Sequence, residues 1–162
     1  TYVIVSNHQS GADILVLFTL RLHFKWVAKR ILFFVPFLGW NMAMNRYIAL
    51  RRGKKSSMHR MMEQSKQGLL QGNSMMIFPE GTRSKTGELG KLKRGSLLAA
   101  LKSGAPIVPV AISGSFNIMP RKTWLINPCP VKLSVGRPIY ITNEKDYDNK
   151  VEEVRASIAS ML

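Results

Sequence analysis

The chain has 162 residues, a length that fits one domain with a hydrophobic core of its own. Its hydrophobic fraction of 46% excludes a disordered tail, and its single cysteine, Cys129, excludes an internal disulfide and a cysteine-based metal cluster. Twenty-four lysines and arginines against nine aspartates and glutamates give a formal net charge of +15, which indicates partners that carry anionic groups, such as phosphates, lipid surfaces or nucleic acid.

Short apolar runs and helical patterns alternate through the first half of the chain. We predict strands over residues 2–6, 24–29 and 47–50, a helix that Ser10 opens, and a second helix over 56–71. The second helix carries its apolar residues on one face: Met58, Met61, Met62 and Leu69.

An uncharged apolar block of 14 residues spans 31–44 and is interrupted by Pro36 and Gly39. It is too short to cross a bilayer, which takes about 20 apolar residues. Tryptophans and basic residues lie beside it, a pattern typical of an element in a membrane interface. A core helix or loop is the alternative interpretation.

The second half continues the alternation. Strands are predicted over 74–78, 106–113 and 131–135, and helices over 96–103 and from about Asn143 onward. This order predicts an α/β fold with a mixed, largely parallel central sheet flanked by helices, and one domain over 1–162. Because the sequence begins inside a predicted strand, we expect a membrane-anchoring segment upstream in the native protein.

The stretch from Val5 to Ile14 places His8 directly after the first strand and Asp13 five residues further on. A histidine whose ring is held by an aspartate can serve as a general base near neutral pH. The alternative is structural, because Ser10 and Asp13 have the spacing of a helix capping box. An aspartate at a helix start can serve both purposes.

Two clusters of basic residues indicate contact with anions. The loop 78–95 displays Arg83, Lys85, Lys91, Lys93 and Arg94 around glycine-containing turns that suit a phosphate, although a solvated loop has the same composition. Arg46, Arg51, Arg52, Lys54 and Lys55 form the second cluster, beside the apolar block, where they suit an anionic membrane surface or headgroup.

Three segments together resemble the glycerolipid acyltransferase family, typified by 1-acylglycerol-3-phosphate acyltransferases. Residues 7–13, NHQSGAD, resemble its Asn-His-x4-Asp block, residues 78–84, FPEGTRS, match its third block, and residues 107–112, IVPVAI, resemble its fourth. The likeness covers about Val3 to Ile139. In the second block Arg46 and Arg51 replace the usual glycine and aspartate, while Arg52 fits the final arginine, so the identity of the acceptor stays open.

The resemblance implies a role for each matching residue. His8 would be the general base that deprotonates the acceptor hydroxyl, and Asp13 would orient it. The acceptor phosphate site would be shaped by four residues of the third block: Glu80, Gly81, Thr82 and Arg83. Lys93 would be a further phosphate ligand, and Arg52 of the second block would help to bind the acceptor. The hydroxyl would attack the donor thioester directly, without an acyl-enzyme intermediate and without a cofactor or metal.

The predicted function is therefore a membrane-surface O-acyltransferase of phospholipid biosynthesis, on the cytoplasmic face. It would move an acyl group from acyl-CoA or acyl-carrier protein to 1-acylglycerol 3-phosphate and give phosphatidic acid. Glycerol 3-phosphate and a lyso-ornithine lipid are alternative acceptors. A non-catalytic basic module that binds anionic lipid or nucleic acid is the alternative from another class. Only one aromatic residue, Tyr47, accompanies the basic residues at 46–60, so no nucleic acid is expected as a partner.

Overall fold

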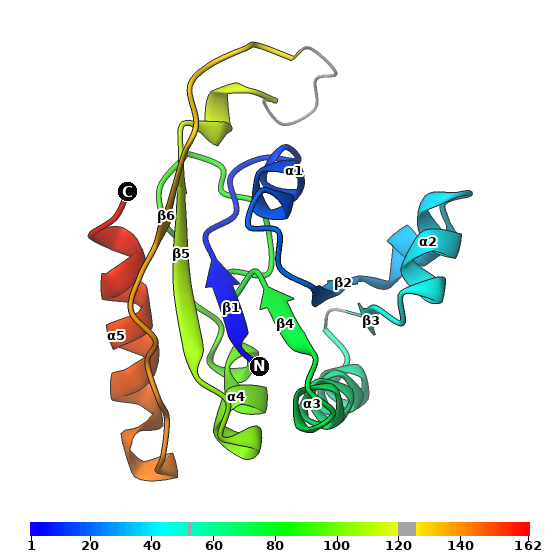
Figure 1. Ribbon diagram of the computed structural model, residues 1–162, viewed down its shortest axis with the longest axis vertical. Helices are drawn as coiled ribbons and strands as arrows, with labels where there is room; N and C mark the ends of the chain where they lie inside the picture. The colour runs from blue at the N-terminus through cyan, green and yellow to red at the C-terminus, as the bar shows by residue number, and fades with distance from the viewer. Residues whose placement is uncertain (52, 120–125) are drawn as a thin grey trace.

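The computed structural model describes residues 1–51, 53–119 and 126–162, which form a six-stranded sheet with helices on both faces (Figure 1). The strands are β1 (Val3–Ser6), β2 (Phe24–Lys29), β3 (Ile48–Leu50), β4 (Ser74–Ile77), β5 (Ile107–Ser113) and β6 (Lys132–Val135). They lie in the order β3-β2-β4-β1-β5-β6. The first five in this order are parallel, and β6 runs antiparallel to β5. The prediction of an α/β fold with a mixed, largely parallel sheet is confirmed.

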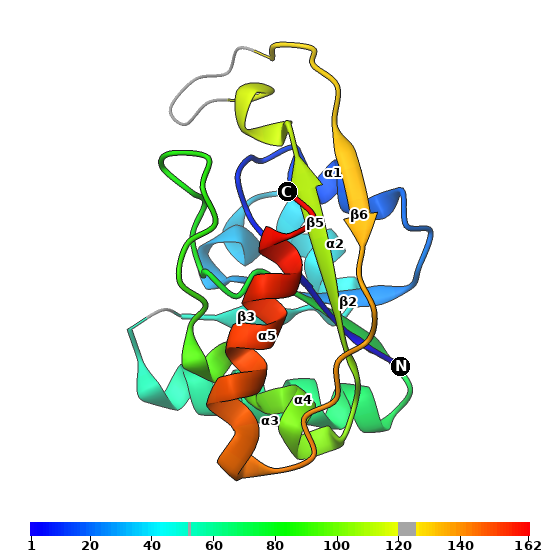
Figure 2. The same ribbon diagram turned by 90° about the vertical axis from the view of Figure 1, so that its left-hand side faces the viewer.

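Five α-helices connect and cover these strands within the described residues. They are α1 (Asp13–Phe18), α2 (Leu38–Met44), α3 (Lys55–Leu70), α4 (Leu98–Ser103) and α5 (Tyr147–Ala159). Helix α5 covers the sheet on one side and α1 lies on the other, as Figures 1 and 2 show. Short 3-10 turns complete the described elements: Arg30–Phe34, Arg94–Ser96, Ser115–Asn117 and Glu144–Asp146.

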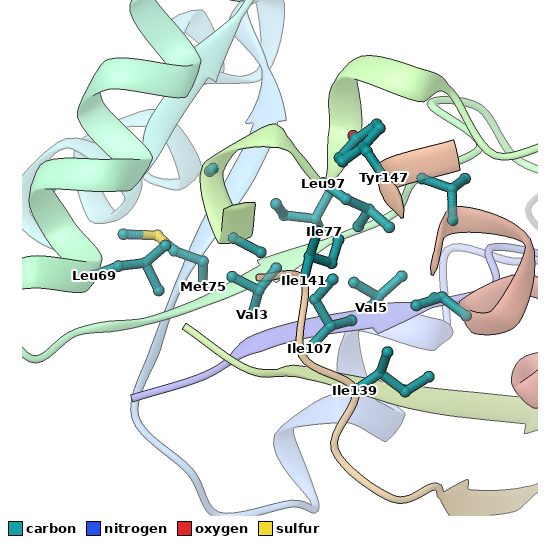
Figure 3. Packing of buried hydrophobic residues seen from close by; sticks show 14 of the residues in the cluster. Val3, Val5, Leu69, Met75, Ile77, Leu97, Ile107, Ile139, Ile141 and Tyr147 are labelled. Atoms are coloured by element: carbon teal, nitrogen blue, oxygen red, sulfur yellow. The ribbon is translucent and has the colours of Figure 1, made fainter. Parts of the chain in front are cut away.

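The core follows the period of two that a strand imposes on its side chains. Val3 and Val5 of β1 point into a cluster beneath α3, α4 and α5, which Figure 3 shows, whereas Ile4 belongs to a second cluster beneath α1. The predicted apolar face of α3 is confirmed, since Met61, Met62 and Leu69 are buried and Met58 packs against the first cluster.

Helix boundaries differ from the sequence predictions at two places. The first helix begins at Asp13 rather than directly after Ser10, and residues 11–12 form a turn beside the bond from the Ser10 N–H to the Asp13 carboxylate. The last helix begins at Tyr147, after a 3-10 turn in which the Lys145 N–H donates to Asn143 Oδ1. At both sites a side chain accepts a hydrogen bond from the backbone of a turn, and the regular helix begins after that turn.

The apolar block 31–44 lies on the surface, so its interpretation as a core element is wrong. It forms the 3-10 turn Arg30–Phe34 and helix α2, and Phe37 and Met44 are 78% and 76% exposed. In the described parts of the chain, no helix has the length and apolarity that a bilayer crossing requires. The block therefore presents apolar side chains outward.

Helix α5 also holds the end of the basic loop. The Tyr147 hydroxyl donates to the carbonyl of Arg94, and Arg94 Nε lies 2.8 Å from Asp148 Oδ1. Burial raises the pKa of Tyr147 to about 12, so the hydroxyl keeps its proton at neutral pH and remains a donor. The C-terminal helix thus stabilises the loop segment that carries Lys93.

Candidate active site

The two predicted site segments leave the sheet side by side. Strand β1 pairs in parallel with β4, with Val5 opposite Ile77, so the residues that follow each strand meet at one edge of the sheet. Asn7 continues the link to β5, because its side chain bonds both the N–H and the carbonyl of Ile112 at 2.8 and 2.9 Å. Carboxyl ends of parallel strands are the usual place for a site in open α/β sheets.

His8 and Asp13 form a hydrogen-bonded pair. His8 Nδ1 lies 2.8 Å from Asp13 Oδ2, and the Asp13 side chain is fully buried. The same oxygen accepts from the backbone N–H groups of Gln9 and Ser10 at 2.7 and 2.9 Å. A carboxylate only accepts hydrogen bonds, so it selects the tautomer with the proton on Nδ1 and leaves Nε2 free to take one.

Only one of the two hydrogen bonds of a capping box is present between Ser10 and Asp13. Asp13 accepts from the Ser10 N–H as the acid of a capping box does, but Ser10 Oγ accepts from Ala12 N–H at 3.3 Å rather than from Asp13. The aspartate therefore orders the loop before α1 and holds the histidine at the same time.

Phe78 packs against the face of the histidine. The two rings are stacked with centroids 3.9 Å apart and an interplanar angle of 13°. The ring centroid of Trp26 lies 5.7 Å from that of Phe78. This stack restricts the imidazole to one plane. Sequence reasoning assigned no role to Phe78, although its place at the end of a predicted strand marks the same sheet edge as His8.

Glu80 joins the two site loops through their backbones. Its Oε1 accepts from the N–H of His8 at 2.9 Å and its Oε2 accepts from the N–H of Gly90 at 3.0 Å. The carbonyl of His8 accepts in return from Ser84 N–H at 2.7 Å. Both carboxylate oxygens therefore accept hydrogen bonds within the protein. Glu80 holds the backbone of His8 and does not line the cavity.

Replacing Glu80 by glutamine is expected to lower the free energy of unfolding by about 1–3 kcal/mol, because the amide NH2 would face one of the two buried N–H donors. Chemical denaturation measures the change. Glu88→Gln, at an exposed glutamate of the same loop, is the matched control and should leave the stability unchanged. Equal effects of the two substitutions would contradict a stabilising role for these two hydrogen bonds of Glu80, which we call the Glu80 clamp.

A cavity of about 340 Å³ opens beside the histidine. Its wall is mostly apolar and includes Ile14, Phe18, Trp26, Phe78, Met58 and Met61. His8, Gly81 and Lys93 also line the cavity, so polar groups accompany the apolar wall. Such a cavity has the size and character of a site for a small or elongated apolar ligand that carries a polar end.

The remaining predicted site residues differ in their distance from this cavity. Lys93 lies across Gly81, since a Cβ on Gly81 would be 2.9 Å from Lys93 Nζ, and Gly81 has a φ of +71° that favours glycine. Thr82 is exposed, Arg83 is half-buried, and neither lines the cavity. Arg52 lies outside the described residues.

A further cavity residue, Lys29, was not predicted as part of the site. Lys29 ends β2 and lines the cavity with an exposed side chain. The signal was available, because its predicted strand ends at the same sheet edge as the strand before His8.

The sequence model of the family described as Acyltransferase matches residues 1–113. The chain belongs to the acyltransferase family. The matched part contains the His8–Asp13 pair, the Glu80 clamp and β5, so the resemblance found in the three sequence blocks is confirmed at the level of the family.

Individual relatives are named as 1-acyl-sn-glycerol-3-phosphate acyltransferases. The chain is 35% identical to the chloroplastic BAT2 protein of Brassica napus over 99% of this chain and 46% of that protein. It is 32% identical to the Pseudomonas aeruginosa protein over 88% of this chain and 55% of that one. The acyltransferase chain thus spans about half the length of the curated relatives it matches.

A solved structure has the same fold. The crystal structure of the 1-acyl-sn-glycerophosphate (LPA) acyltransferase PlsC from Thermotoga maritima superimposes with a TM-score of 0.83 at 29% identity. The match covers 99% of this chain and 64% of that one. The acyltransferase fold described above therefore accounts for nearly all of the present chain.

Proposed function

We propose that the chain is the catalytic part of an O-acyltransferase that acylates the free hydroxyl of 1-acylglycerol 3-phosphate and forms phosphatidic acid. The observation that carries this proposal is the buried Asp13 holding His8 with its second nitrogen free, beside a mostly apolar cavity. The names of the relatives support the acceptor.

The proposed reaction is a direct transfer. Nε2 of His8 takes the proton of the acceptor hydroxyl while that oxygen attacks the carbonyl carbon of the donor thioester. The tetrahedral intermediate then collapses, the C–S bond breaks, and the imidazolium returns its proton to the departing thiolate. The products are one ester and one thiol, so the scheme needs no acyl-enzyme and no resident cofactor.

Acyl-CoA or acyl-carrier protein would supply the thioester. The apolar wall of the cavity suits a fatty acyl chain, and the lysines that line it suit the phosphates that both substrates carry. Because these donors are intracellular, we place the reaction at the cytoplasmic face of a membrane that holds the lipid acceptor.

The acceptor phosphate would be bound by the basic residues above the cavity. Lys93 lies at its rim, and Arg83 directly precedes Ser84, whose backbone N–H bonds the His8 carbonyl. Arg83 and Lys93 both belong to the loop that follows β4, and cations of this kind suit a phosphate near the hydroxyl to be acylated.

Arg83→Ala is expected to lower kcat/KM for lysophosphatidic acid by about 10- to 100-fold, the effect of losing one hydrogen bond to a charged group. Initial rates with monoacylglycerol, which lacks the phosphate, should change far less. Arg137→Ala, at an exposed arginine beyond β6, is the matched charge control. An equal loss with both acceptors would contradict a phosphate contact.

An acceptor panel tests the proposal as a whole. The purified protein is given acyl-CoA with lysophosphatidic acid, glycerol 3-phosphate or lyso-ornithine lipid, and the products are identified by mass spectrometry. We expect phosphatidic acid from the first acceptor at the highest kcat/KM. Faster use of either other acceptor would show that the proposed acceptor is wrong. Lipid binding without turnover of any acceptor would favour a non-catalytic module.

A further inference from the structure

Exposed apolar side chains are concentrated in one part of the chain. Of the 17 large apolar side chains that are exposed within the described residues, 11 lie between positions 14 and 44. We call the exposed apolar side chains of residues 14–44 the apolar face. A concentration of exposed apolar side chains of this kind indicates an interaction site rather than the scattered exposure of ordinary surfaces.

The two helices of the apolar face lie on the same side of the sheet. Figure 2 views the molecule from the α5 side, and both α1 and α2 lie behind the sheet in that view. The cavity is lined by Ile14 and Phe18 of α1 and by Leu38 of α2, and these three side chains are themselves exposed. The mouth of the cavity therefore opens within the apolar face.

A strained turn holds one aromatic residue outward. Phe37 has φ +62° and ψ −54°, and the N–H of Leu38 donates to the carbonyl of Pro36 at 2.7 Å, which together define a γ-turn of the strained kind. A bulky residue rarely adopts a positive φ. Phe37 is 78% exposed and contacts Trp40 edge-on at 5.3 Å, so within the protein little burial offsets this strain.

The charged residues of the segment that carries the apolar face all have one sign. Residues 14–62 contain ten lysines and arginines and no aspartate or glutamate, whereas the rest of the chain holds the other 14 basic residues and all nine acids. Apolar and aromatic side chains bordered by lysine and arginine suit the interface of an anionic bilayer. The same charge disfavours a cationic partner surface.

We propose that the apolar face docks on an anionic bilayer, with Phe37 and Trp40 inserted among the lipids and the cavity mouth open to the leaflet. A lipid acceptor then reaches His8 by lateral movement, without passing through water. The docking stands on the apolar face and its charge. The entry of the acceptor rests on the proposed function.

Sedimentation with vesicles tests the docking. The purified protein is mixed with vesicles of phosphatidylcholine and phosphatidylglycerol in equal parts, or of phosphatidylcholine alone. We expect stronger binding to the anionic vesicles and a fall of about tenfold or more in the partition coefficient for the double variant Phe37→Asn, Trp40→Gln. Tyr140→Asn removes an aromatic that is 57% exposed in the segment after β6, and this variant should bind as the wild type does.

Thermal unfolding separates docking from folding. Asparagine tolerates a positive φ better than phenylalanine, so Phe37→Asn should not lower the midpoint of unfolding. Unchanged vesicle binding by the double variant, or the same loss in Tyr140→Asn, would overturn the proposal. A concentration-dependent dimer that the double variant abolishes, with no vesicle binding by the wild type, would assign the face to a second copy and overturn it as well.

Activity measurements separate this proposal from the proposed function. The double variant should turn over a short-chain, water-soluble lysophosphatidic acid at the wild-type rate and a vesicle-borne acceptor more slowly. Equal loss with both acceptors would contradict docking as the cause. No turnover by the wild type with either acceptor would count against the proposed function and leave the vesicle-binding result to decide the docking.

Discussion

Replacing His8 by alanine is expected to lower kcat for acyl transfer by about 10²–10⁴-fold, the usual contribution of a positioned general base. The loss arises because Nε2 of His8 is the proposed acceptor of the hydroxyl proton. Initial rates with acyl-CoA and lysophosphatidic acid measure it. KM for the donor should change little, since the apolar wall that would hold the acyl chain remains.

The other histidines provide the control for His8. His59 lies exposed on α3, away from the cavity, so His59→Ala should keep wild-type turnover. Thermal unfolding checks that His8→Ala is folded despite the lost stacking on Phe78. A folded His8→Ala protein with wild-type kcat would show that the base assignment is wrong.

Asp13→Asn is expected to lower kcat by about 10²–10⁴-fold as well, although the side chain never touches substrate. The amide NH2 of asparagine can donate to Nδ1 of His8, which would move the ring proton to Nε2 and remove the base. The kcat of the variant, compared with its KM, measures the effect, because a positioning role should appear in kcat.

Asp13→Asn should also reduce stability by about 1–3 kcal/mol, since three N–H groups converge on the buried oxygen Oδ2. Asp148→Asn is the control, as that carboxylate forms an exposed pair with Arg94 that contributes little. Loss of stability with unchanged kcat would leave Asp13 a purely structural residue and contradict its role toward His8.

The strands and the meeting of His8 with Asp13 could be predicted from the sequence. Short β-branched apolar runs such as residues 2–6 are typical of buried strands, and the histidine follows the first of them directly. The five-residue spacing lets the aspartate of the next helix reach back to the ring. These are local properties, and local chemistry is what a single sequence records.

The tertiary contacts of the site could not be predicted. Nothing in the loop 78–95 distinguishes a glutamate that binds substrate from one that accepts two distant backbone N–H groups, as Glu80 does. The exposure of residues 31–44 is likewise decided by the rest of the fold, because an apolar block of this length packs inside many proteins. The start of α1 was also predicted wrongly, because residues 11–12 form a turn before the helix begins at Asp13.

The hydrogen bond between the His8 N–H and Glu80 joins residues 72 positions apart in the chain. During synthesis the histidine is made long before the residue that fixes its backbone, and contacts of such sequence separation form late because the entropy of closing the intervening loop must first be offset. A collapsed chain in which β1 and β4 have not paired therefore lacks the hydrogen bond from Glu80 that holds the backbone of His8. Under the proposed mechanism, recovery of catalysis on refolding should follow the pairing of these two strands.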